Sequence, residues 1–474
     1  MLKEGTYNFI GGILKLVMGL VYIPTLLYLL GANKFGLYSI ISSIILFISS
    51  IEYSLGIVTT VVVSSKKQND VTLSCLVIGI IFALAATFAT FVISYSVPYF
   101  FKILSYNDVM VVTSVMRLGA FIVFFKIIIQ FYIGLEQSFS RYGVQNIISL
   151  VLLLLSNSGS VIIASQSKSL LNIFLWQLIS HVIVFVIHSY YCIRNRLIKV
   201  NEIAIKLDRS KTKEIGKFLL RMMPNSLSSL LFTQGDKLVV GSILGPELTG
   251  IYSTFTNISM QINIISSLPI QPLISKMNDL TMSTIKLQRL IKTAISVNIL
   301  IASSLGIFVI CFSTEITSLI VRNVEQIEGL SYILALLSFV YTVYSYNAVG
   351  YYVLISTKRE NITNIILIVS SLLSLALIVL LASKIGLLGA ALGNSAFLLS
   401  LILLYMGTEV VKMRRNYLNR RLMIAVVVVS TSFLTFLTNV MMIKIFLFIV
   451  CLVLIVLGQP KIMRSYLKLY LKKQ

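Results

Sequence analysis

Two segments of the sequence repeat one another and indicate how the chain is organised. Residues 29–39 read LLGANKFGLYS, and residues 243–253 read ILGPELTGIYS. Each copy lies between two long apolar segments. The two glycines of each copy suit a tight hairpin between helices, because glycine adopts backbone angles that other residues avoid. Short hairpins often have such a pattern, but the match between the copies predicts two like halves.

The composition indicates a membrane protein. Of the 474 residues, 57% are hydrophobic and only 12% are charged, whereas about a quarter of the residues in a soluble domain are charged. The formal net charge is +23. The first apolar segment is too long for the core of a signal peptide and has no small-residue cleavage site, so we expect it to remain in the protein.

Long apolar segments predict the number of membrane crossings. A helix that spans about 30 Å of hydrocarbon needs about 20 mostly apolar residues, and it satisfies its own backbone hydrogen bonds. The fourteen segments that qualify are residues 8–30, 37–63, 71–95, 108–133, 144–165, 170–192, 218–244, 250–275, 293–313, 329–355, 363–383, 387–411, 422–439 and 441–458. The last two are short and closely joined, so 12 or 13 crossings are the alternatives. The expected fold class is an all-α polytopic membrane protein with about 14 transmembrane helices.

The distribution of lysine and arginine predicts the orientation. With a cytoplasmic N terminus, the segments on the inner side hold 28 of the 39 basic residues, and the outer turns hold five. Cytoplasmic loops are enriched in these residues, so we expect both termini in the cytoplasm. Because the charge is spread over eight segments with no folded domain to present it, we expect anionic membrane lipids, and no nucleic acid, as its partners.

The repeat and the basic segments predict the domains. An even number of spans separates the two copies, so both halves begin on the same face of the membrane and form parallel repeats around a central cavity. The predicted domains are a six-helix bundle at 1–192, a basic cytoplasmic linker at 193–217, a second six-helix bundle at 218–411, and two appended helices with a basic tail at 412–474.

Motifs of several enzyme classes are missing from the sequence. There is no GxxxxGK[ST] segment and no HExxH, and the two histidines share one span, which makes no zinc site. The four cysteines lie in or beside apolar runs without CxxC spacing, so we interpret them as buried core residues. No connection is long enough for a soluble catalytic domain. We therefore predict no catalytic residue, no metal and no bound cofactor.

Three motifs resemble the polysaccharide transporter family of the multidrug/oligosaccharidyl-lipid/polysaccharide exporter superfamily. Residues 24–38, with PTLLYLLG followed by FGLY, resemble the first hairpin of that family. Residues 233–252, with TQGDK, LGPE and GIY, are similar to its seventh span and the hairpin that follows. Residues 386–391, GLLGAA, are similar to the start of its twelfth span. One difference is Tyr28, because this family often has a basic residue there.

The resemblance implies a flippase that moves undecaprenyl-pyrophosphate-linked oligosaccharide units from the cytoplasmic to the outer leaflet by alternating access, for O-antigen, capsule or exopolysaccharide synthesis. It implies the bacterial cytoplasmic (inner) membrane, with the polysaccharide polymerase and the chain-length machinery as further partners. One alternative is a cation-coupled drug antiporter of the same superfamily, which the excess of basic residues within spans disfavours. The other is a membrane polysaccharide polymerase, which the lack of a large outer loop disfavours.

Basic residues inside the predicted spans are costly and need a reason. The six are Lys15, Arg117, Lys126, Arg221, Lys237 and Lys444. Arg221 and Lys444 lie near a membrane face and are explained by snorkelling. Lys15, Arg117 and Lys237 are candidates for binding the substrate pyrophosphate, since a guanidinium or ammonium group can hold an oxyanion. Arg117 and Lys126 are nine residues apart and therefore face opposite sides of one helix, and we expect Lys126 to reach the cytoplasmic interface.

Two carboxylates within spans have two interpretations each. Glu52 is expected at nearly the depth of Lys15 on the neighbouring span, which indicates an ion pair. Asp236 adjoins Lys237, although adjacent residues do not face each other on a helix. Alternatively, Glu52 or Asp236 takes up H+ or Na+ and couples an ion gradient to transport.

Polar residues form a stripe on each of two predicted helices. Gln177, His181 and His188 share one face of the sixth span, and Asn257 and Gln261 share a face of the eighth. Such stripes either hold helices together through hydrogen bonds or line a cavity. Gln177, His181, Asn257 and Gln261 are therefore candidates for contact with the sugar.

Overall fold

The computed structural model describes residues 18–19, 21–66, 69–198, 209–270, 284–321, 329–357, 359–413, 415–438 and 440–458. Within these ranges the chain forms helices and no strands. Each of the fourteen predicted spans falls on a helical segment in its described part, which confirms the all-α polytopic fold. Nine helical segments of the described chain are long and apolar enough to cross a membrane by themselves. The count is below fourteen partly because Glu360–Val410 joins two predicted spans in one helical segment.

The chain forms two compact units, Met1–Ile251 and Tyr252–Gln474. The helices of the first unit are Val21–Leu30, α2 (Ala32–Ile48), α3 (Ile51–Lys66), α4 (Asn69–Phe100), α5 (Tyr106–Ser138), α6 (Tyr142–Ser167), α7 (Leu170–Arg194), α8 (Arg209–Leu230), the π-helix η2 (Leu231–Gly235) and the first part of α9 (Asp236–Ser267). The division lies beyond the predicted linker at 193–217, so α8 and the start of α9 belong to the first unit. The boundaries of the predicted bundles stay a prediction.

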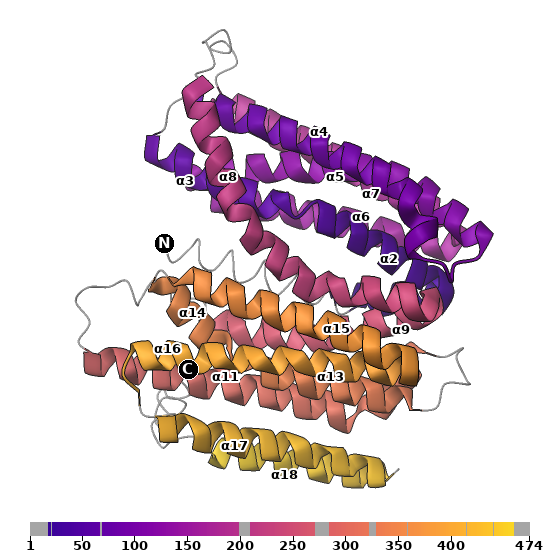
Figure 1. The fold of residues 1–474 in the computed structure, drawn as a ribbon, viewed down its shortest axis with the longest axis vertical. Helices are drawn as coiled ribbons and strands as arrows, with labels where there is room; N and C mark the ends of the chain where they lie inside the picture. Colours follow the sequence, from indigo (N-terminus) through magenta and orange to yellow (C-terminus); the bar gives the residue numbers. More distant parts are fainter. Residues whose placement is uncertain are drawn as a thin grey trace. The chain divides into compact units, whose positions relative to one another are not determined.

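Helix α5 is the central element of the first unit. It packs against α3, α4 and α7, and it runs beside the long helix α4 (Figure 1). Its start is fixed by Ser105, whose hydroxyl oxygen accepts a hydrogen bond from the backbone N–H of Asp108 at 3.2 Å. Its buried face is mostly apolar, but Glu136 is also completely buried. Helix α5 therefore carries an acidic side chain into the packed interior of the unit.

The two copies of the repeat form similar hairpins that meet in the first unit. Gly31 and Gly245 both have positive φ, at 79° and 82°, and nearly extended ψ, at 161° and 177°. This conformation is essentially restricted to glycine. Gly36 packs against the Pro246 carbonyl, and Gly250 packs against the backbone of Gly36, its counterpart in the first copy. The internal repeat is therefore present in the backbone geometry as well as in the sequence.

The second unit consists of the helices that follow Ile251. They are the end of α9, the 3₁₀ helix η3 (Leu268–Ile270), α11 (Thr284–Cys311), α12 (Ser313–Ile320), α13 (Leu330–Ser345), α14 (Ala348–Ser356), α15 (Glu360–Gly393), η4 (Asn394–Leu401), α16 (Ile402–Val410), α17 (Arg415–Thr431), η5 (Ser432–Leu437) and α18 (Met441–Leu457). Helix α15 is kinked at Gly386, which has φ of 61° and separates the two predicted spans. Helices α17 and α18 lie side by side (Figure 1).

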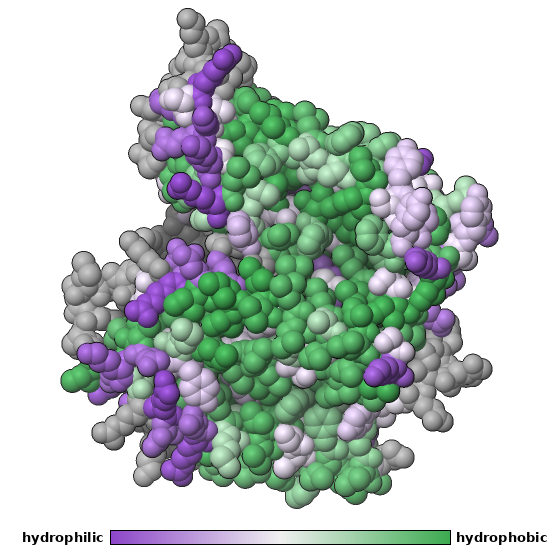
Figure 2. All heavy atoms as spheres, viewed as in Figure 1, coloured by the Kyte–Doolittle hydropathy of each residue, from purple (hydrophilic) through white to green (hydrophobic). Residues whose placement is uncertain are grey.

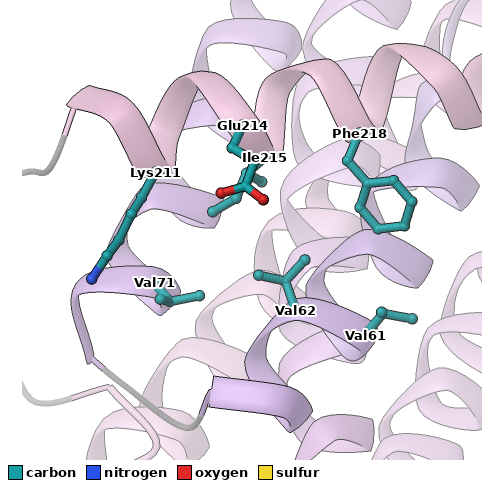
Figure 3. Close-up of a pocket in the computed structure, with 7 residues that line it drawn as sticks. All are labelled: Val61, Val62, Val71, Lys211, Glu214, Ile215 and Phe218. Carbon is teal, nitrogen blue, oxygen red and sulfur yellow. The ribbon is translucent and has the colours of Figure 1, made fainter.

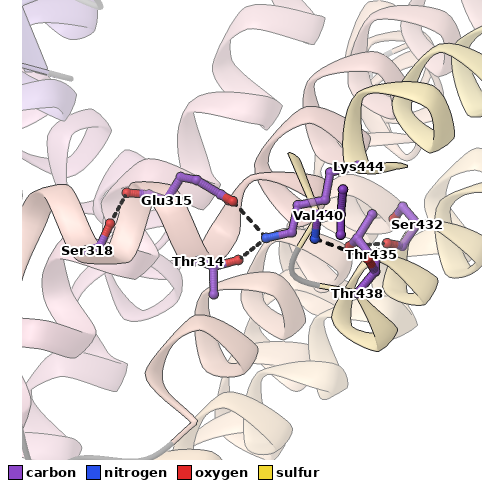
Figure 4. Close-up of polar contacts among 8 residues, drawn as sticks. All are labelled: Thr314, Glu315, Ser318, Ser432, Thr435, Thr438, Val440 and Lys444. Carbon is purple, nitrogen blue, oxygen red and sulfur yellow. Dashed lines mark hydrogen bonds and ion pairs between the residues drawn. The ribbon is translucent and has the colours of Figure 1, made fainter. Parts of the chain in front are cut away.

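Lys444 of α18 does not snorkel, contrary to the sequence prediction. Its side chain is only 4% exposed, and its Nζ lies 2.7 Å from Glu315 Oε1 of α12 and 2.7 Å from the hydroxyl of Thr314 (Figure 4). The sequence did not reveal this partner, because Glu315 lies just beyond a predicted span. The ion pair ties α18 to the start of α12.

The outer surface of the helices is apolar, as a lipid environment requires. On the face drawn in Figure 2, hydrophobic side chains cover the sides of the helices, and hydrophilic ones gather at helix ends, including the start of α8. Arg209, Lys213, Lys217 and Arg221 are exposed on that part of α8. The snorkelling predicted for Arg221 agrees with this exposure. The protein is therefore a multi-pass membrane protein.

All four cysteines are free and buried, as the sequence predicts. Cys75, Cys192, Cys311 and Cys451 have exposed fractions of 0–2%. No cluster of three potential metal-ligating side chains is found among the residues that the structure covers. The cysteines therefore serve as core residues.

Candidate functional site

The second predicted span is interrupted near its middle. Helix α2 ends at Ile48 and α3 begins at Ile51. The two residues between them are serines, so neither proline nor glycine causes this break. The Ser49 hydroxyl donates to the carbonyl of Leu46 at 3.2 Å, and the N–H of Glu52 donates to the Ser49 carbonyl at 2.8 Å. Irregular backbone at membrane depth is tolerated where protein or a cavity surrounds it, and transporters use such breaks to form binding sites.

Glu52, directly after this break, forms an ion pair with Lys126 of α5. The Nζ of Lys126 lies 3.4 Å from Glu52 Oε1 and 3.4 Å from the Ser49 hydroxyl. The side chains of Lys126 and Glu52 are 18% and 8% exposed. Lys126 therefore points to Glu52 rather than to the cytoplasmic interface, because a buried carboxylate offers it a better partner. Lys15, the partner expected from the sequence, lies outside the described residues.

Loss of this ion pair should strongly destabilise the first unit. Replacing Lys126 by alanine leaves Glu52 buried without its cation, which typically costs about 3–5 kcal/mol of unfolding free energy. We expect Lys126→Ala to lower the unfolding temperature of the purified protein in detergent markedly. The double variant Glu52→Gln with Lys126→Met should recover most of the loss, since it removes both charges. A double variant as unstable as the single one would contradict this explanation.

Asp236 and Lys237 lie where a π-helix meets α9. The π-helix η2 ends at Gly235, and both residues are buried. The Nζ of Lys237 lies 3.4 Å from Gln234 Oε1, which also accepts a hydrogen bond from the Ser43 hydroxyl of α2 at 2.9 Å. Asp236 Oδ1 accepts the backbone N–H of Lys237 at 2.8 Å. Short π-helical segments are frequent at functional sites, so this polar cluster remains a candidate.

Arg117 of α5 is packed against two aromatic rings of α4. Its guanidinium carbon lies 4.7 Å from the ring centre of Tyr95 and 5.9 Å from that of Phe91. Its Nε is buried and donates no hydrogen bond to any residue that the structure describes. Within the described chain no carboxylate forms an ion pair with it, whereas Lys126 and Lys444 each have one. Arg117 and Lys126 therefore contact different helices, as their spacing predicts.

The polar stripe of the sixth span holds helices together in the structure. Gln177 Nε2 donates to the hydroxyl of Tyr38 at 3.2 Å, and this hydroxyl also lies 3.1 Å from that of Tyr22. His181 Nδ1 lies 2.7 Å from the carbonyl of Gln177 on its own helix. The three helices involved are Val21–Leu30, α2 and α7. These contacts agree with the structural interpretation of the stripe and leave a sugar-binding role untested.

The stripe of the eighth span belongs to the second unit. Asn257 and Gln261 are both partly buried on α9. Gln261 Oε1 is buried and has no hydrogen-bond partner within the described chain. A buried amide oxygen of this kind normally finds a partner, so a hydroxyl-bearing ligand or water would suit it. The four residues predicted to contact the sugar are therefore divided between the two units.

A cavity at the start of α8 lies apart from all these candidates. It has a volume of about 190 Å³ and is lined by Val61, Val62, Val71, Lys211, Glu214, Ile215 and Phe218 (Figure 3). Lys211 Nζ lies 2.6 Å from Asp70 Oδ2, so the cavity wall includes a salt bridge between α8 and α4. The lining is apolar apart from Lys211 and Glu214, which carry opposite charges. The cavity therefore has no preference for an anion, and it is not part of the candidate site.

The profile of the family described as "Polysaccharide biosynthesis protein" matches residues 1–278. The chain belongs to this family. The match confirms the resemblance seen in the sequence, and it contains Glu52, Arg117, Lys126 and Lys237. No curated protein matches this family member at the sequence level.

Solved membrane transporters share the fold of this family member. The lipid II flippase MurJ in an inward closed conformation has a TM-score of 0.75 and 14% identity, over 98% of this chain and 100% of the other. An inward-facing MATE family transporter of the MOP superfamily has a TM-score of 0.70 and 12% identity, over 84% and 94%. The Vibrio cholerae MATE transporter VcmN in its bent form has a TM-score of 0.56 and 14% identity, over 87% and 96%. At such identities the likeness shows the fold alone.

Proposed function

We propose that this protein is a flippase that moves undecaprenyl-pyrophosphate-linked oligosaccharide units from the cytoplasmic to the outer leaflet by alternating access. Its product would serve O-antigen, capsule or exopolysaccharide synthesis. The family supports a role in polysaccharide biosynthesis, and the fold that it shares with a lipid II flippase supports transport of a lipid-linked substrate. The proposal includes no enzymatic step by this chain.

One observation carries the proposal, namely a membrane-embedded cation that pairs with no carboxylate of the described chain. Arg117 lies in the first half of the long apolar helix α5, and its charge is stabilised by ring faces. A guanidinium has a planar set of donors that matches phosphate oxygens. A pyrophosphate group that enters the membrane needs such a partner, because a bare oxyanion in hydrocarbon is very unfavourable.

The remaining roles follow from the same substrate chemistry. Lys237 and Lys15 would assist Arg117 in binding pyrophosphate, and Gln177, His181, Asn257 and Gln261 would contact the sugar. Glu52 or Asp236 would bind H+ or Na+ if an ion gradient drives the cycle. The protein would lie in the bacterial inner membrane with both termini in the cytoplasm, and it would supply a polysaccharide polymerase and its chain-length machinery.

Cells that lack this protein test the proposal. Lipid-linked single units should accumulate on the cytoplasmic side, and surface polymer should disappear until the full chain is expressed again. A polymerase defect would instead leave single units at the cell surface. A drug antiporter defect would leave the polymer unchanged and raise drug sensitivity. Either of these two phenotypes would replace the flippase proposal.

A further inference from the structure

A second buried charge pair lies in the first unit and has no role in the proposed substrate site. His188 Nδ1 of α7 lies 2.7 Å from Glu136 Oε1 of α5, and both side chains are 0% exposed. The other two polar atoms of the pair, Glu136 Oε2 and His188 Nε2, are buried without a hydrogen-bond partner in the described chain. Buried polar atoms are almost always paired, so these two require an explanation.

Few titratable groups surround this pair. On α5, the ring of Tyr132 is parallel to the imidazole, at 6.3 Å between ring centres and 9° between planes. On α7, Cys192 Sγ lies 3.9 Å from Glu136 Oε1. Among the residues the structure describes, no lysine or arginine forms an ion pair with Glu136.

The neighbouring helices contribute uncharged groups. Thr60 of α3 donates its hydroxyl proton to the carbonyl of Gly134 at 3.1 Å. Gln145 of α6 donates to the hydroxyl of Ser149. Ile129 of α5, Ile148 of α6 and Val184 of α7 form a buried apolar cluster. These contacts add no charged partner to the pair.

The number of protons on the pair decides its net charge. With a neutral imidazole and an ionised carboxylate, the pair carries one uncompensated negative charge, which is very costly in a dry interior. One further proton, shared between the two groups, makes the pair neutral overall. Because the groups are in direct contact, they bind this proton as a unit. Loss of the proton becomes favourable only when water reaches Oε2 and Nε2.

We infer that Glu136 and His188 form a proton-binding site that couples proton movement to the conformational cycle of the proposed flippase. The pair is close to the ends of α5 at Ser138 and α7 at Arg194, which the charge pattern predicts to be cytoplasmic. Movement of α5 against α7 would admit water and release the proton there. This inference rests on the proposed function, and it places coupling at a pair that sequence reasoning did not assign. Unlike Glu52, Glu136 has no lysine partner among the described residues.

Infrared spectroscopy on the purified full-length protein tests proton binding without any substrate. The carboxyl absorption of the wild type should contain a component from protonated, buried Glu136. Glu136→Gln should remove this signal. Glu409→Gln is the matched control, because Glu409 is exposed on α16, and it should retain the signal. His188→Gln should shift the frequency of this signal, since the imidazole no longer shares the proton.

The dependence of export on the proton gradient tests coupling in cells. Glu136→Gln and His188→Gln should each reduce export at least about tenfold with the protein still in the membrane, and Glu136→Asp should restore part of it. An unchanged carboxyl signal in Glu136→Gln, or in His188→Gln if the first variant does not fold, would overturn the proton site. Wild-type gradient dependence in both variants would overturn coupling. A wild-type protein that binds the proton but exports nothing would instead overturn the proposed function.

Discussion

Replacing Arg117 by alanine should nearly abolish export of lipid-linked units while the protein remains in the membrane. Losing the charged partner of a desolvated anion typically costs about 2–5 kcal/mol, which corresponds to a reduction of about 30-fold or more. Arg117 has no carboxylate partner in the described chain, so its removal leaves no buried acid there without a cation. We therefore expect the fold to stay intact. Export is measured from surface polymer and from the accumulation of single lipid-linked units.

Two further variants separate charge from geometry at this position. Arg117→Lys keeps the charge but loses the planar set of donors, so we expect partial export. Arg221→Ala removes an exposed arginine from α8 and serves as the control with normal export. Normal export by Arg117→Ala would remove Arg117 from the substrate site and withdraw the main support for the flippase proposal.

The hairpin contact of the repeat should be the most sensitive packing site of the first unit. A methyl group added at Gly36 would overlap the carbonyl of Pro246, which is backbone and cannot rotate away. Overpacking usually costs about 1–3 kcal/mol, and more where backbone must shift. We expect Gly36→Ala to reduce the yield of monodisperse protein severely and to lower its unfolding temperature in detergent.

The comparison variant for this prediction is Gly216→Ala on α8. A methyl group at Gly216 meets no neighbouring atom of the described chain, and alanine favours helix more than glycine does, so this variant should be neutral or slightly more stable. Gly250→Ala should behave like Gly36→Ala, because it would strike the backbone of Ala32 and Gly36. Equal behaviour of Gly36→Ala and Gly216→Ala would show that the hairpins do not pack as described.

The membrane spans and the repeat could be predicted because they depend on local sequence. Apolar length sets the helices, and Gly31 and Gly245 occupy backbone conformations that glycine alone adopts readily. The break between α2 and α3 could not be predicted, since Ser49 and Ser50 lack the constraints of proline or glycine. That interruption depends on the contacts of Ser49 with Lys126 and with its own helix.

The charge partners required the tertiary structure. Glu52 was expected near Lys15, but Lys126 reaches it from a helix far along the chain. Glu136 lies beyond the predicted span 108–133, because no local pattern indicated that α5 continues to Ser138. Its contact with His188 joins positions 52 residues apart. The prediction of a span gives the depth of a residue along one helix. Which two side chains form a pair depends on how both helices are rotated and packed.

The burial of all four cysteines makes the native chain a convenient background for labelling. A membrane-impermeant thiol reagent would find almost no exposed thiol on the wild type. A single cysteine introduced at Lys213 or at Lys34 would therefore report its own side of the bilayer, without prior replacement of native residues. The assignment of inner and outer faces, which rests on the distribution of positive charge, can be checked residue by residue in intact cells.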